Sequence, residues 1–188
     1  MRKIFTDVLK RQLPLLFAQR FSDFTPYRPK QTAEEKEKFP LPLATDYFRR
    51  IRGPLWEIIG IRRYSQDEWT LEIFWSIQAR FPSSRLNCDY GIVNIEELLV
   101  QPEAHTCSRD IVRDGNPTDW PVWLCSLPFN DPDYQKRYVV EYLQPVAQDV
   151  AERKVAEQLK STADVIEKFV LPLFAEVEKH MTGTAQNS

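Results

Sequence analysis

The chain has 188 residues and a net charge of −2, with 43% hydrophobic and 28% charged residues. This length fits one domain with a sizeable core, and the composition excludes both a disordered chain and an integral membrane protein. The slightly acidic balance gives no global electrostatic reason to bind nucleic acid or an anionic membrane.

The N-terminal quarter predicts a helix followed by extended chain. Residues 3–20 have apolar side chains at helical spacing, and Pro14 is expected to kink or restart this helix. The segment at residues 21–28 is short, rich in aromatic residues and ended by prolines, which fits a brief edge strand or an extended arm. The segment at about 30–44 is charged and then Pro-rich, so we expect an exposed excursion with one helical turn followed by extended chain.

The segment from Leu55 to Phe81 (LWEIIGIRRYSQDEWTLEIFWSIQARF) predicts a hairpin around which the chain packs, after a strand at residues 45–52 that Gly53-Pro54 ends. Every second residue from Trp69 to Ala79 is apolar, which is the period of a strand with one buried face. We place Tyr64 opposite Trp69, so that Ile58 faces Trp75 and Gly60 leaves room above Ile73.

That register puts two carboxylates, Glu57 and Glu72, on the second face of the hairpin together with Arg63 and Arg80. A close carboxylate pair could serve as an acid/base device. Cross-strand pairing with the arginines favours a solvated or salt-bridged surface instead.

The middle of the chain predicts one more strand, a short helix and a long loop. Residues 90–93 fit a strand, and Asn94 with Glu97 has the spacing of a capping box that opens a helix through Val100; a strand continuing through Ile95 is the alternative. Residues 101–119 lack periodicity, so we expect a loop that is functional or mobile. Residues 120–129 (WPVWLCSLPF) are expected to return to the core as a last strand or a packed loop.

The C-terminal third is predicted to be helical. Asp131-Pro132 marks a helix start, Pro145 is expected to bend this helix, and Ser161 is expected to begin another that contains Pro172. The tail at about 182–188 is expected to fray. The resulting fold class is α+β: a single domain over residues 1–188, with an antiparallel sheet of about four or five strands packed on N- and C-terminal helices.

Motifs that concentrate chemistry are missing from the sequence. The 5 glycines form no phosphate-binding loop, and neither GxSxG nor HExxH occurs. Cys88, Cys107 and Cys125 are an odd number without a CxxC pair, which favours reduced thiols and a cytoplasmic location over a disulfide framework or a zinc ribbon. We therefore predict no cofactor, no metal site, no membrane span and no catalytic residue.

Two alternatives to a binding protein stay open. His105-Thr106-Cys107, with Asp110 and Asp114 nearby, is compatible with a metal site or a Cys/His pair in a small-ligand enzyme. The arginines between positions 49 and 63, interleaved with aromatic residues, resemble a surface for single-stranded nucleic acid, although the acidic C-terminal helices can neutralise them. These arginines are Arg49, Arg50, Arg52, Arg62 and Arg63.

Three segments, MRKIFTDVLKRQLPLL at the start, WTLEIFWSIQ in the hairpin and FVLPLF near the end, resemble small bacterial cytoplasmic proteins. In layout, most of the chain is similar to the helix, antiparallel sheet and helix families found among immunity proteins of contact-dependent or secreted toxin systems. The resemblance implies a non-enzymatic protein that neutralises a toxin by binding it directly, without a set of catalytic residues.

Candidate contact residues for a protein partner lie in the second half of the chain, besides the excursion at about 30–44. Trp120 and Trp123 could serve as aromatic anchors next to the 101–119 loop, since such residues are common at interfaces. Burial in the core is the competing interpretation for both tryptophans. An acidic helical surface with Asp149, Glu152 and Glu157 is the other candidate.

Overall fold

The computed structural model describes residues 1–38, 41, 45–64, 67–82, 95–111, 123–124 and 144–185. The helices are α1 (Lys3–Arg20), α2 (Ala33–Lys38), α3 (Ile95–Leu99), α4 (Ser108–Ile111), α6 (Gln148–Val165) and α7 (Leu171–Ala185), with the π-helical turn η1 (Ile166–Val170) between the last two. The strands are β1 (Thr25–Tyr27), β2 (Thr45–Arg52), β3 (Leu55–Arg63), β4 (Glu68–Ser76), β5 (Glu103–Cys107) and β6 (Trp123–Leu124).

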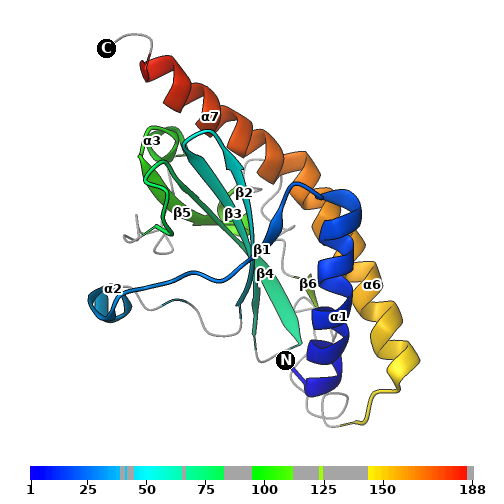
Figure 1. The fold of residues 1–188 in the computed structure, drawn as a ribbon. Helices are drawn as coiled ribbons and strands as arrows, with labels where there is room; N and C mark the ends of the chain where they lie inside the picture. Colours follow the sequence, from blue (N-terminus) through cyan, green and yellow to red (C-terminus); the bar gives the residue numbers. More distant parts are fainter. Residues whose placement is uncertain are drawn as a thin grey trace.

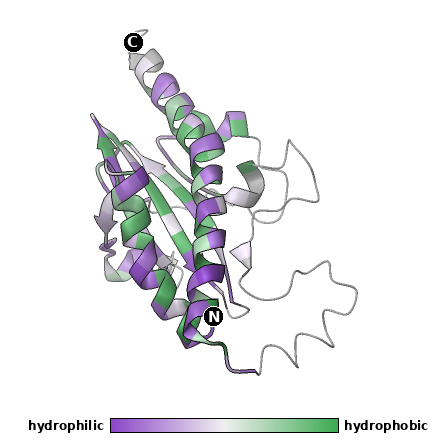
Figure 2. Ribbon diagram, turned by 90° about the vertical axis from the view of Figure 1, so that its right-hand side faces the viewer, coloured by the Kyte–Doolittle hydropathy of each residue, from purple (hydrophilic) through white to green (hydrophobic). Residues whose placement is uncertain are grey.

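The sheet is antiparallel throughout the described residues, in the order β1-β2-β3-β4-β5, and β6 also pairs with β4. Figure 1 shows α1, α6 and α7 together on one side of this sheet. Figure 2 shows hydrophilic and hydrophobic bands alternating along these helices, as expected where one side of a helix is buried. The predicted α+β fold class is confirmed.

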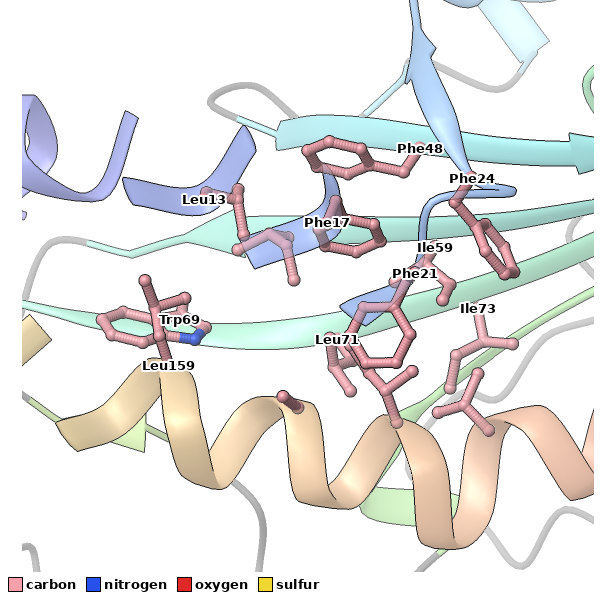
Figure 3. Packing of buried hydrophobic residues seen from close by; sticks show 14 of the residues in the cluster. Leu13, Phe17, Phe21, Phe24, Phe48, Ile59, Trp69, Leu71, Ile73 and Leu159 are labelled. Carbon is pink, nitrogen blue, oxygen red and sulfur yellow. The ribbon is translucent and has the colours of Figure 1, made fainter. Parts of the chain in front are cut away.

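The main core lies between these helices and one face of the sheet. Trp69, Leu71 and Ile73 are fully buried there and point toward the helices (Figure 3). From α1, Phe17 stacks on Phe48 of β2 with ring centroids 3.7 Å apart. Two tryptophans also tie the sheet to α6, because the Trp69 Nε1 donates to Thr162 Oγ1 at 3.1 Å and the Trp123 Nε1 donates to Ser161 Oγ at 3.2 Å.

The central hairpin forms, but its register is one residue from the prediction. Arg63 rather than Tyr64 lies opposite Trp69. The backbone N–H of Tyr64 donates to the Glu68 carbonyl at 2.9 Å, and Asp67 has a φ of +58°. A residue in the left-handed region is typical of a three-residue hairpin loop, which is one residue shorter than the connection that a pairing of Tyr64 with Trp69 implies. As a result Ile59 and Ile61, and not Ile58, share the helix-covered face with the tryptophans of β4.

The predicted long loop at 101–119 is wrong in its first half, because β5 and α4 occupy residues 103–111. The inward-facing residues of β5 are only Ala104 and Thr106, so the strand has almost no hydrophobic signal. The helix predicted from Asn94 is confirmed as α3, which excludes a strand through Ile95. The strand predicted at 90–93 lies outside the described residues.

The prolines of the helices act differently from the prediction. α1 runs from Lys3 to Arg20 through Pro14 without restarting, and Pro145 precedes α6 instead of bending it. No new helix starts at Ser161, because α6, η1 and α7 follow one another without a break to Ala185. The π turn ends two residues before Pro172, whose ring would clash with the carbonyl four residues earlier in an ordinary α-helical turn. The start predicted at 131–132 lies outside the described residues.

Candidate functional site on the second face of the sheet

The face of the sheet opposite α1, α6 and α7 has its own small core. Tyr47, Ile58, Phe74 and Phe81 are buried there and form a cluster separate from the main core. Polar and charged side chains surround this cluster at both ends. They include two groups, an aromatic–arginine patch on β1–β3 and a buried carboxylate cluster on β3–β5.

The aromatic–arginine patch consists of Tyr27, Arg49, Ile51 and Trp56. The guanidinium carbon of Arg49 lies 4.5 Å from the Tyr27 ring centroid and 4.3 Å from that of Trp56. The two rings meet edge to face, with centroids 5.9 Å apart. Beside them Ile51, which pairs with Trp56 across the strands, is 51% exposed. The patch therefore combines a rigidly held cation with an accessible apolar side chain.

The carboxylate cluster consists of Arg62, Glu72 and His105. Glu72 is 3% exposed, His105 Nε2 donates to its Oε2, and Arg62 Nη1 donates to its Oε1 at 3.2 Å. The imidazole of His105 stacks on Phe74 with centroids 4.3 Å apart. Burial raises the pKa of Glu72, but the His105 and Arg62 donors outweigh it and hold that pKa below its usual range. Glu72 is therefore held as a buried carboxylate.

Gly60 and Tyr47 explain how a large aromatic ring fits beside this cluster. A methyl group on Gly60 would lie 3.0 Å from Thr45 Cγ2, 3.1 Å from Tyr47 Cε1 and 3.2 Å from Glu72 Cβ. Gly60 thus gives room on the second face, and not above Ile73 as predicted. Tyr47 lies across this gap, and burial raises its pKa to about 12.

The predicted approach of Glu57 to Glu72 is wrong, because the actual register puts the two carboxylates on opposite faces of the sheet. Glu57 is fully buried on the helix side, where Arg50 Nε donates to its Oε2. Burial raises the pKa of Glu57, although the neighbouring arginines oppose this effect. Arg63, expected beside the pair, instead donates to Asp46, and Arg80 lies 3.5 Å from Glu103.

The arginines between positions 49 and 63 do not form one basic surface. Arg49 and Arg62 lie on the second face, whereas Arg50, Arg52 and Arg63 lie on the helix side. Four of the five contact carboxylates of the described residues, and the exception is Arg49. A nucleic-acid surface requires several cations available to phosphates, and this arrangement leaves Arg49 to fill that role among the five.

The predicted partner-binding residues are scattered. Trp120 lies outside the described residues, and Trp123 is 3% exposed, so its indole belongs to the core. On α6, Asp149 and Glu157 are exposed, while Glu152 pairs with Arg11 of α1 at 2.6 Å. A role of these residues in binding stays a prediction.

His105 and Cys107 point to the same face, and Cys107 lies opposite Glu72 in the sheet register. Asp114 lies outside the described residues. Within the described residues, no group of three or more His, Cys, Asp or Glu side chains is arranged to hold a metal ion. In the same part of the chain, no helix combines the length and the apolar composition that a membrane span requires.

Sequence reasoning missed the patch. Tyr27, Ile51 and Trp56 come from three strands, and no motif in the sequence connects them. These residues come together only because β1 pairs with β2. A strand of three residues is too short to be predicted from its sequence pattern. The one sequence feature that could have indicated the patch is Ile51, an apolar residue between Arg50 and Arg52. It lies in β2, the strand next to the edge strand β1.

Comparisons with known proteins add no relative. No protein family model matches the chain, and neither a curated protein nor a solved structure is significantly similar to it.

Proposed function

We propose that this chain is a non-enzymatic binding protein that contacts a protein partner through the aromatic–arginine patch. The observation that carries the proposal is the exposed Ile51 beside Trp56 and the ring-held Arg49. Trp, Tyr and Arg are the residue types that most often dominate binding energy at interfaces. Their stacking fixes them before binding, which lowers the entropy lost on association.

A toxin of a bacterial competition system is the partner that the sequence resemblance implies. In this proposal the protein neutralises the toxin by covering its surface. Two observations support binding over chemistry: most arginines of β2 and β3 are neutralised by carboxylates within the fold, and Glu72 is satisfied by two donors. Such pairing stabilises a sheet without exposing reactive groups.

The experiment is co-expression of the chain with the polypeptide encoded by the neighbouring gene, followed by calorimetry of the purified complex. Ile51→Ala and Trp56→Ala are expected to weaken the complex, by about tenfold or more for Trp56→Ala, which is the scale of an interface hot spot. Ile51→Ala changes an exposed side chain, so its effect does not depend on refolding of the core.

The control is Asp149→Asn combined with Glu157→Gln, which changes the acidic surface of α6 on the other side of the sheet. This double variant is expected to bind like the wild type. If it loses the complex and Ile51→Ala does not, the acidic surface and not the patch is the binding site. A chain that forms no complex and protects no cell from the neighbouring toxin refutes the proposed function.

A second candidate is a small-ligand enzyme, because His105 is held by Glu72 and shares a face with Cys107. A carboxylate that orients an imidazole is the usual support of a general base. The test is the pH dependence of iodoacetamide alkylation at Cys107 in a Cys88→Ser, Cys125→Ser background. If His105 activates Cys107, alkylation of Cys107 is fast below pH 7, and His105→Gln removes this fast reaction. If Cys107 reacts only as fast as an ordinary thiol, the enzyme candidate is refuted.

A further inference from the structure

We propose that Arg49 is the receptor for a carboxylate side chain presented by the protein partner. This inference rests on the proposed function and adds the chemistry of what is recognised. The environment of the Arg49 guanidinium differs from that of every other arginine on β2 and β3.

The guanidinium of Arg49 is fixed in position before any partner arrives. The ring centroids of Tyr27 and Trp56 lie 4.5 Å and 4.3 Å from its guanidinium carbon. Ring contacts stabilise a cation without neutralising it, because the π face supplies no formal negative charge. The side chain therefore loses little rotational freedom when an anion binds.

Arg49 lacks the carboxylate that its neighbours have. Arg50 Nη1 lies 2.7 Å from Asp23 Oδ2, Arg52 Nη1 lies 3.1 Å from Glu178 Oε2, and Arg62 Nη1 lies 3.2 Å from Glu72 Oε1. No described carboxylate forms a salt bridge with Arg49, and its buried Nε has no hydrogen-bond acceptor among the described residues. The charge of Arg49 is therefore not neutralised by a carboxylate of the described residues, and a carboxylate of the partner would supply this counter-charge.

The surroundings favour a carboxylate over the phosphates of a nucleic acid. The other arginines on this face are already paired, Arg62 with Glu72 and Arg80 with Glu35 and Glu103. One available cation suits a single acidic side chain, whereas phosphate-backbone binding depends on several. The exposed Ile51 beside Arg49 adds an apolar contact that a protein surface can use.

The test uses defined probes, so it does not require the partner. We expect N-acetyl-glutamate α-amide to shift the Nε–Hε NMR signal of Arg49 and the indole signal of Trp56 saturably, while the neutral N-acetyl-glutamine amide does not. Arg49→Gln is expected to weaken binding of the glutamate probe by about tenfold or more, the scale of a charge-assisted hydrogen bond. Arg49→Lys should weaken it less, because lysine keeps the charge but lacks the planar fork.

Arg28→Gln is the matched control, since Arg28 is exposed next to β1 and its loss changes the net charge equally. The inference is overturned if the neutral glutamine amide shifts the NMR signals as much as the glutamate probe does, or if the glutamate probe gives no saturable shift. It is also overturned if inorganic phosphate binds more tightly than the glutamate probe. If Ile51→Ala weakens the protein complex but Arg49→Gln and Arg49→Lys do not, the inference fails and the proposed function stands. If the glutamate probe binds at Arg49 but no protein complex forms, the proposed function fails instead.

Discussion

The hydroxyl of Tyr47 is buried next to the carboxylate cluster, beside Thr45, and no described residue gives it a partner in good hydrogen-bond geometry. An unsatisfied buried donor costs free energy, so Tyr47→Phe is expected to raise the free energy of unfolding at pH 7 by about 1 kcal/mol. The pKa of Tyr47 is about 12, against about 10 for tyrosine in an unfolded chain. The wild type therefore loses stability as the pH rises from about 10 to about 12, and the variant lacks this loss.

Urea unfolding of both proteins at pH 7 and pH 11 measures these two effects of Tyr47→Phe. The advantage of the variant should be larger at pH 11. A variant that is less stable than the wild type at both pH values would mean that the hydroxyl has a stabilising partner.

Glu72 contributes to stability in the opposite pH range. Burial raises its pKa, but hydrogen bonds and charge from His105 and Arg62 lower the pKa by more than burial raises it. The pKa of Glu72 in the folded protein therefore lies below its value in the unfolded chain. The contribution of the carboxylate is therefore fully present above the unfolded pKa of about 4.3 and is lost as the pH falls through the folded value. Glu72→Gln is expected to lower the free energy of unfolding at pH 7 by about 2 kcal/mol, and by less at pH 3.5.

Urea unfolding at the two pH values checks the Glu72→Gln prediction. The control is Glu176→Gln, which removes an exposed carboxylate paired with Lys179, and we expect no measurable change from it. A loss that is the same at pH 7 and pH 3.5 would show that the carboxylate is not the stabilising form of Glu72.

At the scale of elements, the β2–β3–β4 sheet depends on the close approach that Gly60 permits. At contacts of 3.0 Å to 3.2 Å, a methyl group on Gly60 would force Thr45, Tyr47 or Glu72 to shift by a few tenths of an ångström. Gly60→Ala is expected to lower the free energy of unfolding by about 1–3 kcal/mol through overpacking. Urea unfolding followed by tryptophan fluorescence measures this loss.

The β2–β3 turn provides the control for Gly60. Gly53 has a φ of +55° and open space around it, so only its backbone conformation constrains the residue. Gly53→Asn should be tolerated, because asparagine adopts the left-handed region readily, whereas Gly60→Asn should be worse than Gly60→Ala. Equal tolerance of asparagine at both positions would contradict crowding at Gly60.

At the scale of the whole molecule, the sheet and the C-terminal helix are joined by hydrogen bonds buried in the core. Thr162 Oγ1 accepts from Trp69 Nε1 and donates to the Gln158 carbonyl at 2.8 Å. Thr162→Val keeps the shape but leaves the indole N–H without an acceptor, and we expect it to lower the free energy of unfolding by about 1–3 kcal/mol.

Thermal or urea unfolding of Thr162→Val and Ser161→Ala measures this coupling between sheet and helix. Ser161 accepts from Trp123 in a partly exposed position, so water can replace its hydroxyl and the loss should be smaller. If Thr162→Val and Ser161→Ala lower the free energy of unfolding equally, burial of the hydrogen bond does not determine how much its loss destabilises the protein.

The sequence determined the features that depend on local periodicity. Alternation from Trp69 to Trp75 predicted the face of β4 that meets the helices, although the prediction of a single buried face was wrong, because every residue of β4 is buried. Helical spacing from Phe5 to Phe17 predicted the buried side of α1. Ala151, Val155 and Leu159 recur at the same helical spacing and form part of the buried side of α6. These patterns are strong because each residue is buried by the same neighbouring layer along the whole element.

Only the tertiary structure decided the pairing register and the composition of the second face. The hairpin register follows from Asp67, whose left-handed backbone accompanies a hydrogen bond from the distant Arg2 to its carboxylate. The contact of His105 with Glu72 joins residues 33 positions apart, and the Arg49 patch joins three strands. Sequence periodicity specifies which side of an element is buried, but cross-strand contacts depend on register, and a shift of one residue exchanges every partner.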